Sequence, residues 1–231
     1  MRELIPIPDG PWLNVGSGPA NASQWINIDG SWQARLAGNP WLVSIGRYVL
    51  GTEIGHWPAA VKYRDIRRGL GYGKDAVAVV YASHVVEHLY RDEAQRFLRD
   101  VYRSLKPRGV CRIVVPDLAA IVGWYLEHRR QPAVQRTEPS SDLLMSLLLL
   151  RTREAQRGRG PLAWVRRGTD LHQHKWMYDQ EGLQTLFSEA GFSNPEPRGF
   201  LDSAIARAQL EMVEHQDRIC GGAGVCMEAR K

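Results

Sequence analysis

Residues 13–19 read LNVGSGP, and the interpretation of the whole chain depends on this stretch. Three mostly apolar residues, typical of a strand, precede Gly16 and Gly18, and glycine adopts backbone conformations that other residues avoid. A strand that enters such a turn lets the backbone approach a ligand closely, and a helix beyond it presents unpaired N–H groups. The stretch predicts a turn that holds a nucleotide-like cofactor, although an ordinary tight turn explains a lone glycine pair equally well.

The glycine spacing fits an NAD-binding fingerprint poorly. That fingerprint needs a third glycine at position 21, where this chain has Asn21, and an acidic residue about 20 residues further on. Asp29 lies only eleven positions after Gly18, which leaves room for barely two helical turns. It nevertheless ends the next strand-like run, WINID, where a carboxylate can accept hydrogen bonds from both ribose hydroxyls.

Strand-like and helix-like segments alternate after this point. The run AVAVVYAS at 76–83 is typical of a parallel strand that is buried on both faces. Asp92, with Gln95 at the third helical position, predicts the start of a helix that ends at LKPRG. A second helix is predicted to begin after Asp179 and to end before Gly191. Further strands are predicted over 25–29, 60–65, 110–116 and 224–231, and DLLMSLLLL is interpreted as helical. This order predicts an α/β domain with a mainly parallel sheet.

Length and composition indicate a single domain over residues 1–231, because 231 residues with 44% hydrophobic content can bury one sizeable core. A polar, proline-containing and arginine-rich stretch over 129–171 breaks the alternation and predicts a substrate lid or insertion. The longest apolar run is far shorter than the roughly 20 residues of a membrane span. Three cysteines without metal-binding spacing indicate reduced thiols and a cytoplasmic location.

Taken in order, LNVGSGP, WINID, VVYASHVVEHL, LKPRGVCRIVVPDL and HKWMYDQEGLQTLFSEAGF resemble the class I S-adenosylmethionine-dependent methyltransferases. The sequence looks most like their type 11 group, in the bacterial small-molecule and glycan-associated branch. The resemblance covers residues 13–117 and 172–192 and the terminal VCMEARK. It implies a Rossmann-like sandwich whose seven-stranded sheet is mainly parallel, with an antiparallel last strand and helices on both faces.

The resemblance also implies which residues bind S-adenosylmethionine. Asp29 would bind the ribose hydroxyls, Asp65 would lie near the adenine amino group, and Ile66 would pack against the adenine ring. The remaining cofactor residues are those of the glycine turn and of the end of the fourth strand, namely Asn14, Gly16, Ser17, Gly18, Ser83 and His84.

Three departures from the family pattern motivate a second hypothesis. The family often has an acidic residue where Asn14 and Ala78 stand, and its first helix is longer. A chain with these departures could bind the cofactor without catalysis and serve as a partner subunit of an active enzyme.

The chemistry of methyl transfer requires mainly an aligned nucleophile, because the sulfonium of the cofactor is already a strong electrophile. A hydroxyl acceptor usually needs a base, and His84 is the first candidate, with loop packing as the alternative. His172 and His174 are further candidates. Trp176 and Tyr178 could wall an acceptor pocket, or the segment could be a structural lead-in to the last helix.

The triplet of His84, Glu87 and His88 has the spacing i, i+3 and i+4, which places three potential metal ligands on one helical face if a helix begins at Ser83. Ubiquinone-pathway and small-RNA 2′-hydroxyl methyltransferases have a similar Glu-x-x-Glu-His cluster with a distant histidine. Capping or packing is the favoured interpretation of Glu87 and His88, and metal binding is the alternative.

The predicted acceptor is a small molecule, with a hydroxyl oxygen on a sugar or natural-product scaffold preferred. Six arginines between 151 and 167 could bind the phosphate of a nucleotide-linked sugar, although a solvated surface is the favoured interpretation. Nucleic acid, including RNA, is a minority alternative. The sequence carries neither the Asn-Pro-Pro-aromatic motif of amino-directed DNA methyltransferases nor the Pro-Cys nucleophile of the cytosine-C5 type.

Overall fold

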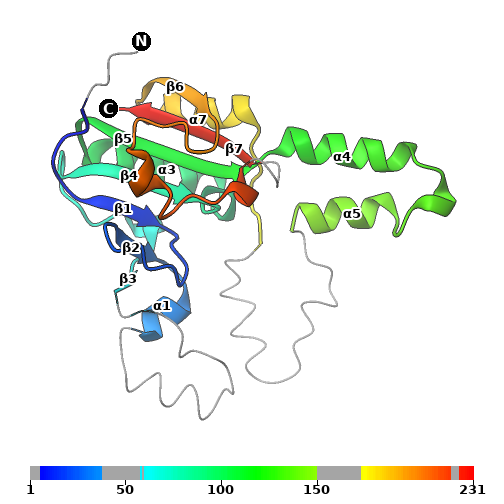
Figure 1. The fold of residues 1–231 in the computed structure, drawn as a ribbon, viewed down its shortest axis with the longest axis horizontal. Helices are drawn as coiled ribbons and strands as arrows, with labels where there is room; N and C mark the ends of the chain where they lie inside the picture. The colour runs from blue at the N-terminus through cyan, green and yellow to red at the C-terminus, as the bar shows by residue number, and fades with distance from the viewer. Residues whose placement is uncertain (1–5, 38–57, 59, 150–172, 220–223) are drawn as a thin grey trace.

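The computed structural model of the protein describes residues 6–37, 58, 60–149, 173–219 and 224–231. Within these residues, seven strands form one sheet in the order β3-β2-β1-β4-β5-β7-β6 (Figure 1). The strands are β1 Trp12–Val15, β2 Ile26–Asp29, β3 Lys62–Tyr63, β4 Val77–Ser83, β5 Leu105–Pro116, β6 Ser193–Arg198 and β7 Gly224–Arg230. Strand β7 runs antiparallel to β5 and β6, and the other strand pairs of the described sheet are parallel. The predicted mainly parallel sheet with an antiparallel last strand is confirmed.

Strand β4 lies at the centre of the sheet, and all of its residues are buried. It pairs in parallel with β1 on one side and with β5 on the other. The continuous apolar run that predicted this strand is therefore explained by burial on both faces. After β1, the chain forms β2 and β3 on one side of β1 and then crosses to the other side to form β4. The strand order therefore reverses beside β1.

Helices cover both faces of the sheet, as predicted. Helices α3 (Arg91–Ser104) and α7 (Gln180–Ala190) pack on one face, where Leu98, Val101 and Phe187 join a large apolar core. The other face is covered by residues 199–219, which include α8 (Arg207–Leu210) and the short 3-10 helix η5 (Gln216–Arg218).

The boundaries of these helices differ partly from expectation. Helix α7 begins and ends as predicted: the Asp179 carboxylate accepts a hydrogen bond from the Gly182 N–H at 2.8 Å, and Gly191 has a left-handed φ of +107°. The predicted start of α3 at Asp92 is wrong, because the helix begins at Arg91 and the Glu93 carboxylate accepts the N–H of Tyr90.

Strand β5 begins at Leu105, inside the stretch that was expected to end helix α3. Leu105, the first residue of LKPRG, has an extended backbone and pairs with Val77 of β4. The pairing shifts register beyond Val77: the next paired residue of β4 is Val79, and its partner on β5 is Val110.

No helix follows the glycine turn, contrary to expectation. Residues 16–25 form consecutive turns, including backbone hydrogen bonds from Ala20 to Ser17 and from Trp25 to Ala22. Proline and asparagine in this short connection favour turns over helix. The Trp25 ring takes the place of a helix on this face, where it packs against Tyr81 with 6.1 Å between ring centroids.

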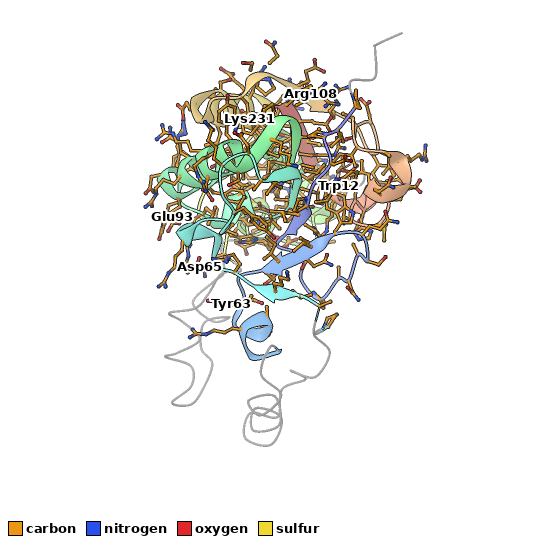
Figure 2. All side chains as sticks on the ribbon, turned by 90° about the vertical axis from the view of Figure 1, so that its left-hand side faces the viewer. Trp12, Tyr63, Asp65, Glu93, Arg108 and Lys231 are labelled. Atoms are coloured by element: carbon orange, nitrogen blue, oxygen red, sulfur yellow. The ribbon has the colours of Figure 1, made fainter. Side chains whose placement is uncertain are left out.

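Both edges of the sheet are poor templates for further strands. Strand β3 is only two residues long, shorter than the predicted segment 60–65, and Figure 2 shows Tyr63 near this edge. At the other edge, β6 contains Pro195 and Pro197, which lack the N–H that a pairing strand requires.

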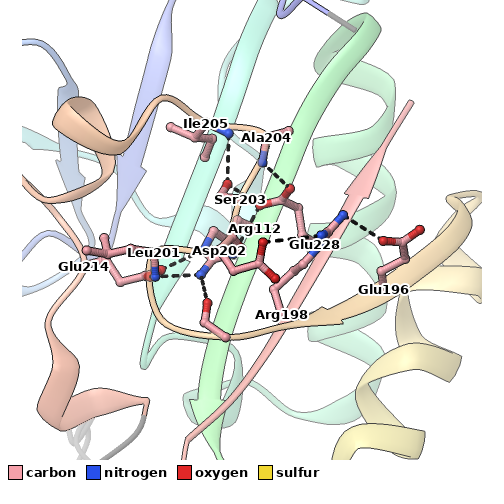
Figure 3. Close-up of polar contacts among 11 residues, drawn as sticks. Arg112, Glu196, Arg198, Leu201, Asp202, Ser203, Ala204, Ile205, Glu214 and Glu228 are labelled. Atoms are coloured by element: carbon pink, nitrogen blue, oxygen red, sulfur yellow. Dashed lines mark hydrogen bonds and ion pairs between the residues drawn. The ribbon is translucent and has the colours of Figure 1, made fainter. Parts of the chain in front are cut away.

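A buried ion-pair network attaches residues 199–214 to the sheet (Figure 3). Arg112 of β5 is fully buried, and its Nε and Nη2 donate to the two carboxylate oxygens of Glu214 at 2.6 and 2.9 Å. Its Nη1 lies 3.2 Å from Oε2 of Glu228 on β7, and the carbonyls of Gly199 and Asp202 accept the remaining hydrogen bonds. The sequence pattern predicted a strand here but not this network.

Helices α4 (Leu118–Arg130) and α5 (Ser140–Leu147) form an arm that projects from the sheet, beyond the end of β5 (Figure 1). A contact of 2.9 Å between His128 Nδ1 and Ser140 Oγ joins the two helices. The predicted lid at 129–171 overlaps this arm up to residue 149, and the rest lies outside the described residues. None of the helices described has the length and apolarity of a membrane-spanning segment.

Candidate functional site

A cavity of about 320 Å³ lies at the carboxyl ends of the parallel strands. Its lining comes from the loops after β1, β2, β3 and β4 and from the small helices α1 (Trp32–Ala37), η2 (Ile66–Arg68) and η3 (Val86–His88). In open parallel sheets, ligands bind at this edge, where the strand order reverses. Among the residues predicted to bind cofactor, the lining includes Gly16, Gly18, Asp29, Asp65, Ile66 and His84.

The two glycines of the turn have different roles. Both have a left-handed backbone, with φ of +68° at Gly16 and +58° at Gly18. A Cβ added to Gly16 would lie 2.2 Å from Cγ2 of Val85, so this position has no room for a side chain. A Cβ added to Gly18 would meet no atom within 4 Å. Because Gly18 lines the cavity, its missing side chain leaves room for a ligand at the backbone.

Asp29 is held rigidly at the end of β2. Its Oδ2 accepts the Gly18 N–H at 2.9 Å and its Oδ1 accepts the Ser31 N–H at 2.8 Å. A carboxylate oxygen can accept two hydrogen bonds, so each oxygen retains acceptor capacity. Two acceptors on one fixed carboxylate suit the adjacent hydroxyls of a ribose. The residues present therefore fit the nucleoside part of S-adenosylmethionine.

Asp65 lies near the start of η2, on the β3 side of the sheet (Figure 2). Its carboxylate binds the Arg67 guanidinium in a two-pronged contact, at 2.8 Å from Nε to Oδ1 and 2.9 Å from Nη2 to Oδ2. This hydrogen bonding to Arg67 lowers the pKa of Asp65. Arg67 and Ile66 also line the cavity, and Arg67 was not predicted to do so.

His84 follows β4 directly and lines the cavity. Its φ of +56° turns the chain out of the strand, and its Nδ1 lies 3.3 Å from Oε1 of Glu87. Its Nε2 is enclosed and has no hydrogen-bond partner in the described part of the chain. If the Nδ1–H points to Glu87, the lone pair of Nε2 is available to accept a proton.

The structure places three predicted cofactor residues away from the cavity lining. The buried Asn14 side chain donates to Oδ1 of Asn27 at 3.0 Å, so it connects β1 with β2 inside the sheet. The Ser17 hydroxyl bonds to the carbonyl of Gly18. Ser83 is buried, and its hydroxyl has no partner among the described residues.

Trp176 and Tyr178, the predicted aromatic wall of an acceptor pocket, line a hollow with Arg91 that is separate from the cavity of the glycine turn. Tyr178 is buried in the core beside α7, where burial raises the pKa of its hydroxyl to about 12. Trp176 is 46% exposed, and neither ring lines the cavity of the glycine turn. His172 lies outside the described residues.

The predicted metal ligands are arranged differently from expectation. A continuous helical face from Ser83 is wrong, because His84 has positive φ and only the short η3 follows. The potential ligand atoms that lie close together belong to Glu87, His88 and His174. His174 is buried, and desolvation lowers the pKa of its imidazole. Its position beside Glu87 depends on tertiary packing, which the local spacing of the triplet does not reveal.

The model of the methyltransferase domain family matches residues 51–113, less than a third of the chain. The matched segment contains Asp65 and His84 but not the glycine turn. No curated protein matches the sequence. Residues 51–113 thus match a methyltransferase domain, and the strand order around this cavity is the one that the resemblance to class I methyltransferases implies.

Similar solved structures share low sequence identity with this chain. They include a methyltransferase from Archaeoglobus fulgidus, 15% identical, with 97% of this chain and 87% of that chain covered and a TM-score of 0.48. A methyltransferase from Mesorhizobium loti is 17% identical, with 99% and 94% covered and a TM-score of 0.46. One from Thermotoga maritima, described as a possible histamine N-methyltransferase, is 14% identical, with 97% and 83% covered and a TM-score of 0.46. At these values, the similarity carries no information about the acceptor.

Proposed function

We propose that the protein transfers the methyl group of S-adenosylmethionine to a hydroxyl oxygen of a small molecule, on a sugar or natural-product scaffold. The observation that carries this proposal is the joint lining of one cavity by Gly18, Asp29 and His84. Gly18 and Asp29 would hold the nucleoside part of the cofactor. The cofactor supplies a methyl group on a positively charged sulfur.

His84 is the proposed base. As the hydroxyl oxygen takes up the methyl group, its proton would pass to Nε2 of His84. Glu87, 3.3 Å from Nδ1, would orient the ring and stabilise its protonated form. A fully buried carboxylate is suited to this task because water does not screen it.

The cytoplasmic location and the lack of nucleic-acid substrate are part of the proposal. Cys111 and Cys226, the described cysteines, are buried and free, which supports a reducing compartment.

Calorimetric titration tests the cofactor assignment. The purified protein is titrated with S-adenosylmethionine, S-adenosylhomocysteine and NAD. We expect binding of the first two and none of NAD. Asp29→Ala is expected to lose binding, whereas Asp217→Ala, which removes an exposed carboxylate on η5, is expected to bind like the wild type. Binding of NAD alone, or unchanged binding by Asp29→Ala, contradicts the assigned pocket.

Kinetics test the base. With an accepted hydroxyl substrate, His84→Ala and His84→Asn should lower the transfer rate by 10²-fold or more, a typical contribution of acid–base catalysis, and change cofactor affinity by less than about threefold. Asparagine tolerates the positive φ of this position, so this variant separates lost chemistry from backbone strain. Equal losses in rate and affinity contradict the base assignment. Tight cofactor binding without transfer to any acceptor favours a non-catalytic partner subunit.

A further inference from the structure

Glu87 carries a buried carboxylate that the described structure leaves without hydrogen bonds. The side chain has no exposed surface, and neither carboxylate oxygen has a hydrogen-bond partner in the described ranges. Oε1 instead lies 3.3 Å from Nδ1 of His84 and 4.0 Å from Nε2 of His174. Buried carboxylates are normally paired, hydrogen-bonded or bound to a metal ion. Two imidazoles thus lie near Oε1 of Glu87, and Oε2 has no hydrogen-bond partner among the described residues.

The imidazole of His88 is already oriented for coordination. Its Nδ1 lies 3.1 Å from the carbonyl oxygen of Gln173, which assigns the ring proton to Nδ1 and leaves the lone pair of Nε2 free. Histidines that bind metals usually donate their other ring N–H to a carbonyl or carboxylate in this way. His88 and His174 also lie close together, with 5.0 Å between their ring centroids.

The chain holds these groups in place from two directions. Glu87 and His88 belong to η3, after β4, whereas His174 comes from the segment before α7. The carbonyl of Glu87 accepts the N–H groups of Lys175 and Trp176 at 2.8 and 3.2 Å, so the two segments are joined by backbone hydrogen bonds. Ligands on a fixed backbone need little reorganisation to bind an ion.

We propose that Glu87, His88 and His174 bind one divalent transition-metal ion. Their candidate ligand atoms all lie within 4.8 Å of one another. Metal–ligand bonds of about 2.0–2.2 Å separate such atoms by about 3–4 Å, so side-chain shifts of about 1 Å complete the site. Two imidazoles and a carboxylate favour Zn²⁺, Co²⁺ or Fe²⁺ over Mg²⁺, which prefers oxygen ligands.

The location gives the ion a role at the cavity. His88 lines the cavity together with His84, and three protein ligands leave coordination positions open. An ion in this position would bind the acceptor oxygen and make its hydroxyl more acidic. This role rests on the proposed methyl transfer, whereas the metal site itself does not.

Metal content and Co²⁺ spectra test the site without any activity measurement. The chelator-treated protein is titrated with Zn²⁺ and, separately, with Co²⁺, and bound metal is measured by mass spectrometry after desalting. We expect one equivalent of either ion, with Co²⁺ producing visible absorption bands, and no competition from Mg²⁺. Glu87→Gln, His88→Gln and His174→Gln should each weaken binding at least tenfold. His215→Gln, which changes an exposed histidine outside the cluster, should bind like the wild type.

The variants are first checked for folding by circular dichroism. Glu87 and His174 are buried, so His88→Gln, at a partly exposed position, is the variant whose fold is least disturbed. Failure of the folded wild-type protein to retain stoichiometric Zn²⁺ or Co²⁺ overturns the proposal, as does equal binding by His88→Gln and the wild type.

Cofactor titration of the same samples separates the two proposals. If metal binds but S-adenosylmethionine does not, the proposed function fails and the metal site stands. If the cofactor binds but no metal is retained, the metal site fails and the proposed function stands.

Discussion

Gly16 and Gly18 should differ in how much a side chain at each position destabilises the protein. A left-handed backbone costs an L-residue about 1–2 kcal/mol, and a clash in a packed region adds about 1–3 kcal/mol. Gly16→Ala should therefore lower the free energy of unfolding by about 2–4 kcal/mol, because its Cβ meets Val85. Gly18→Ala should lower it by about 1–2 kcal/mol. Urea denaturation measures both values.

Two further measurements separate sterics from backbone strain. Adding Val85→Ala to Gly16→Ala should recover part of the lost stability, because Val85 Cγ2 is the atom that the new Cβ would meet. Gly18→Ala should weaken S-adenosylmethionine binding more than its stability loss suggests, because its methyl group enters the cavity. Equal stability losses in the two single variants would count against the different roles.

Tyr178 gives the protein a specific weakness at high pH. The ordinary pKa of tyrosine is about 10, and burial raises the pKa of Tyr178 to about 12. Below pH 10 both states keep the proton, but between pH 10 and 12 only the unfolded state loses it. The free energy of unfolding should fall by about 2–3 kcal/mol across this interval because of Tyr178 alone.

Tyr178→Phe should remove this part of the alkaline loss. Its stability at pH 7 should change little, since the hydroxyl has no partner among the described residues. Tyr90→Phe, at a position 57% exposed, is the control and should retain the wild-type pH dependence. Urea denaturation at pH 7, 10 and 11.5 provides the comparison. Identical alkaline losses in wild type and Tyr178→Phe would contradict the assignment.

At the scale of elements, Arg112 joins β5 to the segment that covers one face of the sheet. Removing the arginine leaves the Glu214 carboxylate buried without its counter-ion, which typically costs about 3–5 kcal/mol. Arg112→Met should cause such a loss, measured by urea denaturation. Arg96→Met, which breaks the exposed Arg96–Asp92 pair of α3, should cost less than about 1 kcal/mol.

A double variant distinguishes the cost of an unpaired buried carboxylate from the cost of lost packing. Arg112→Met combined with Glu214→Leu should be more stable than Arg112→Met alone, because no carboxylate of Glu214 is then left buried. If the stability losses of the two single substitutions simply add, the network stabilises the protein mainly by fixing the geometry of the loop that it holds.

The elements that sequence predicted well are those with strong local patterns. Strand β4 is apolar throughout because it is buried on both faces, and α7 has a capping aspartate and a terminal glycine, so local chemistry determines each. The connection after Gly18 was predicted wrongly, because a tryptophan side chain covers the face that a helix was expected to cover. Arg112 escaped prediction because a single arginine in an apolar strand does not reveal its partners.

At the scale of the whole molecule, ligand binding should raise stability. A ligand at 100 times its dissociation constant adds about 2.7 kcal/mol to the free energy of unfolding. For a chain of this size, we expect S-adenosylhomocysteine to raise Tm by about 5–10 °C. Asp29→Ala should show no increase at the same ligand concentration, in a thermal scan. An equal shift in both proteins would place the ligand elsewhere.

The sequence could predict only those residues of the candidate site that lie at the carboxyl ends of the parallel strands. Gly18, Asp29, Asp65 and His84 follow four parallel strands, so their meeting at one edge follows from the topology. The proximity of His174 to Glu87 depends on how a distant segment packs against η3. Neighbouring residues in the sequence carry no information about that contact.

The order of strands in space has a consequence for synthesis on the ribosome. Of the seven strands described, β7 comes last in the sequence, yet it lies between β5 and β6 and pairs with both. Until residues 224–230 have emerged, β6 has no neighbour and one side of β5 stays open. The sheet therefore cannot close progressively from the N-terminus, and a nascent chain stalled before β7 would present an apolar strand edge to chaperones.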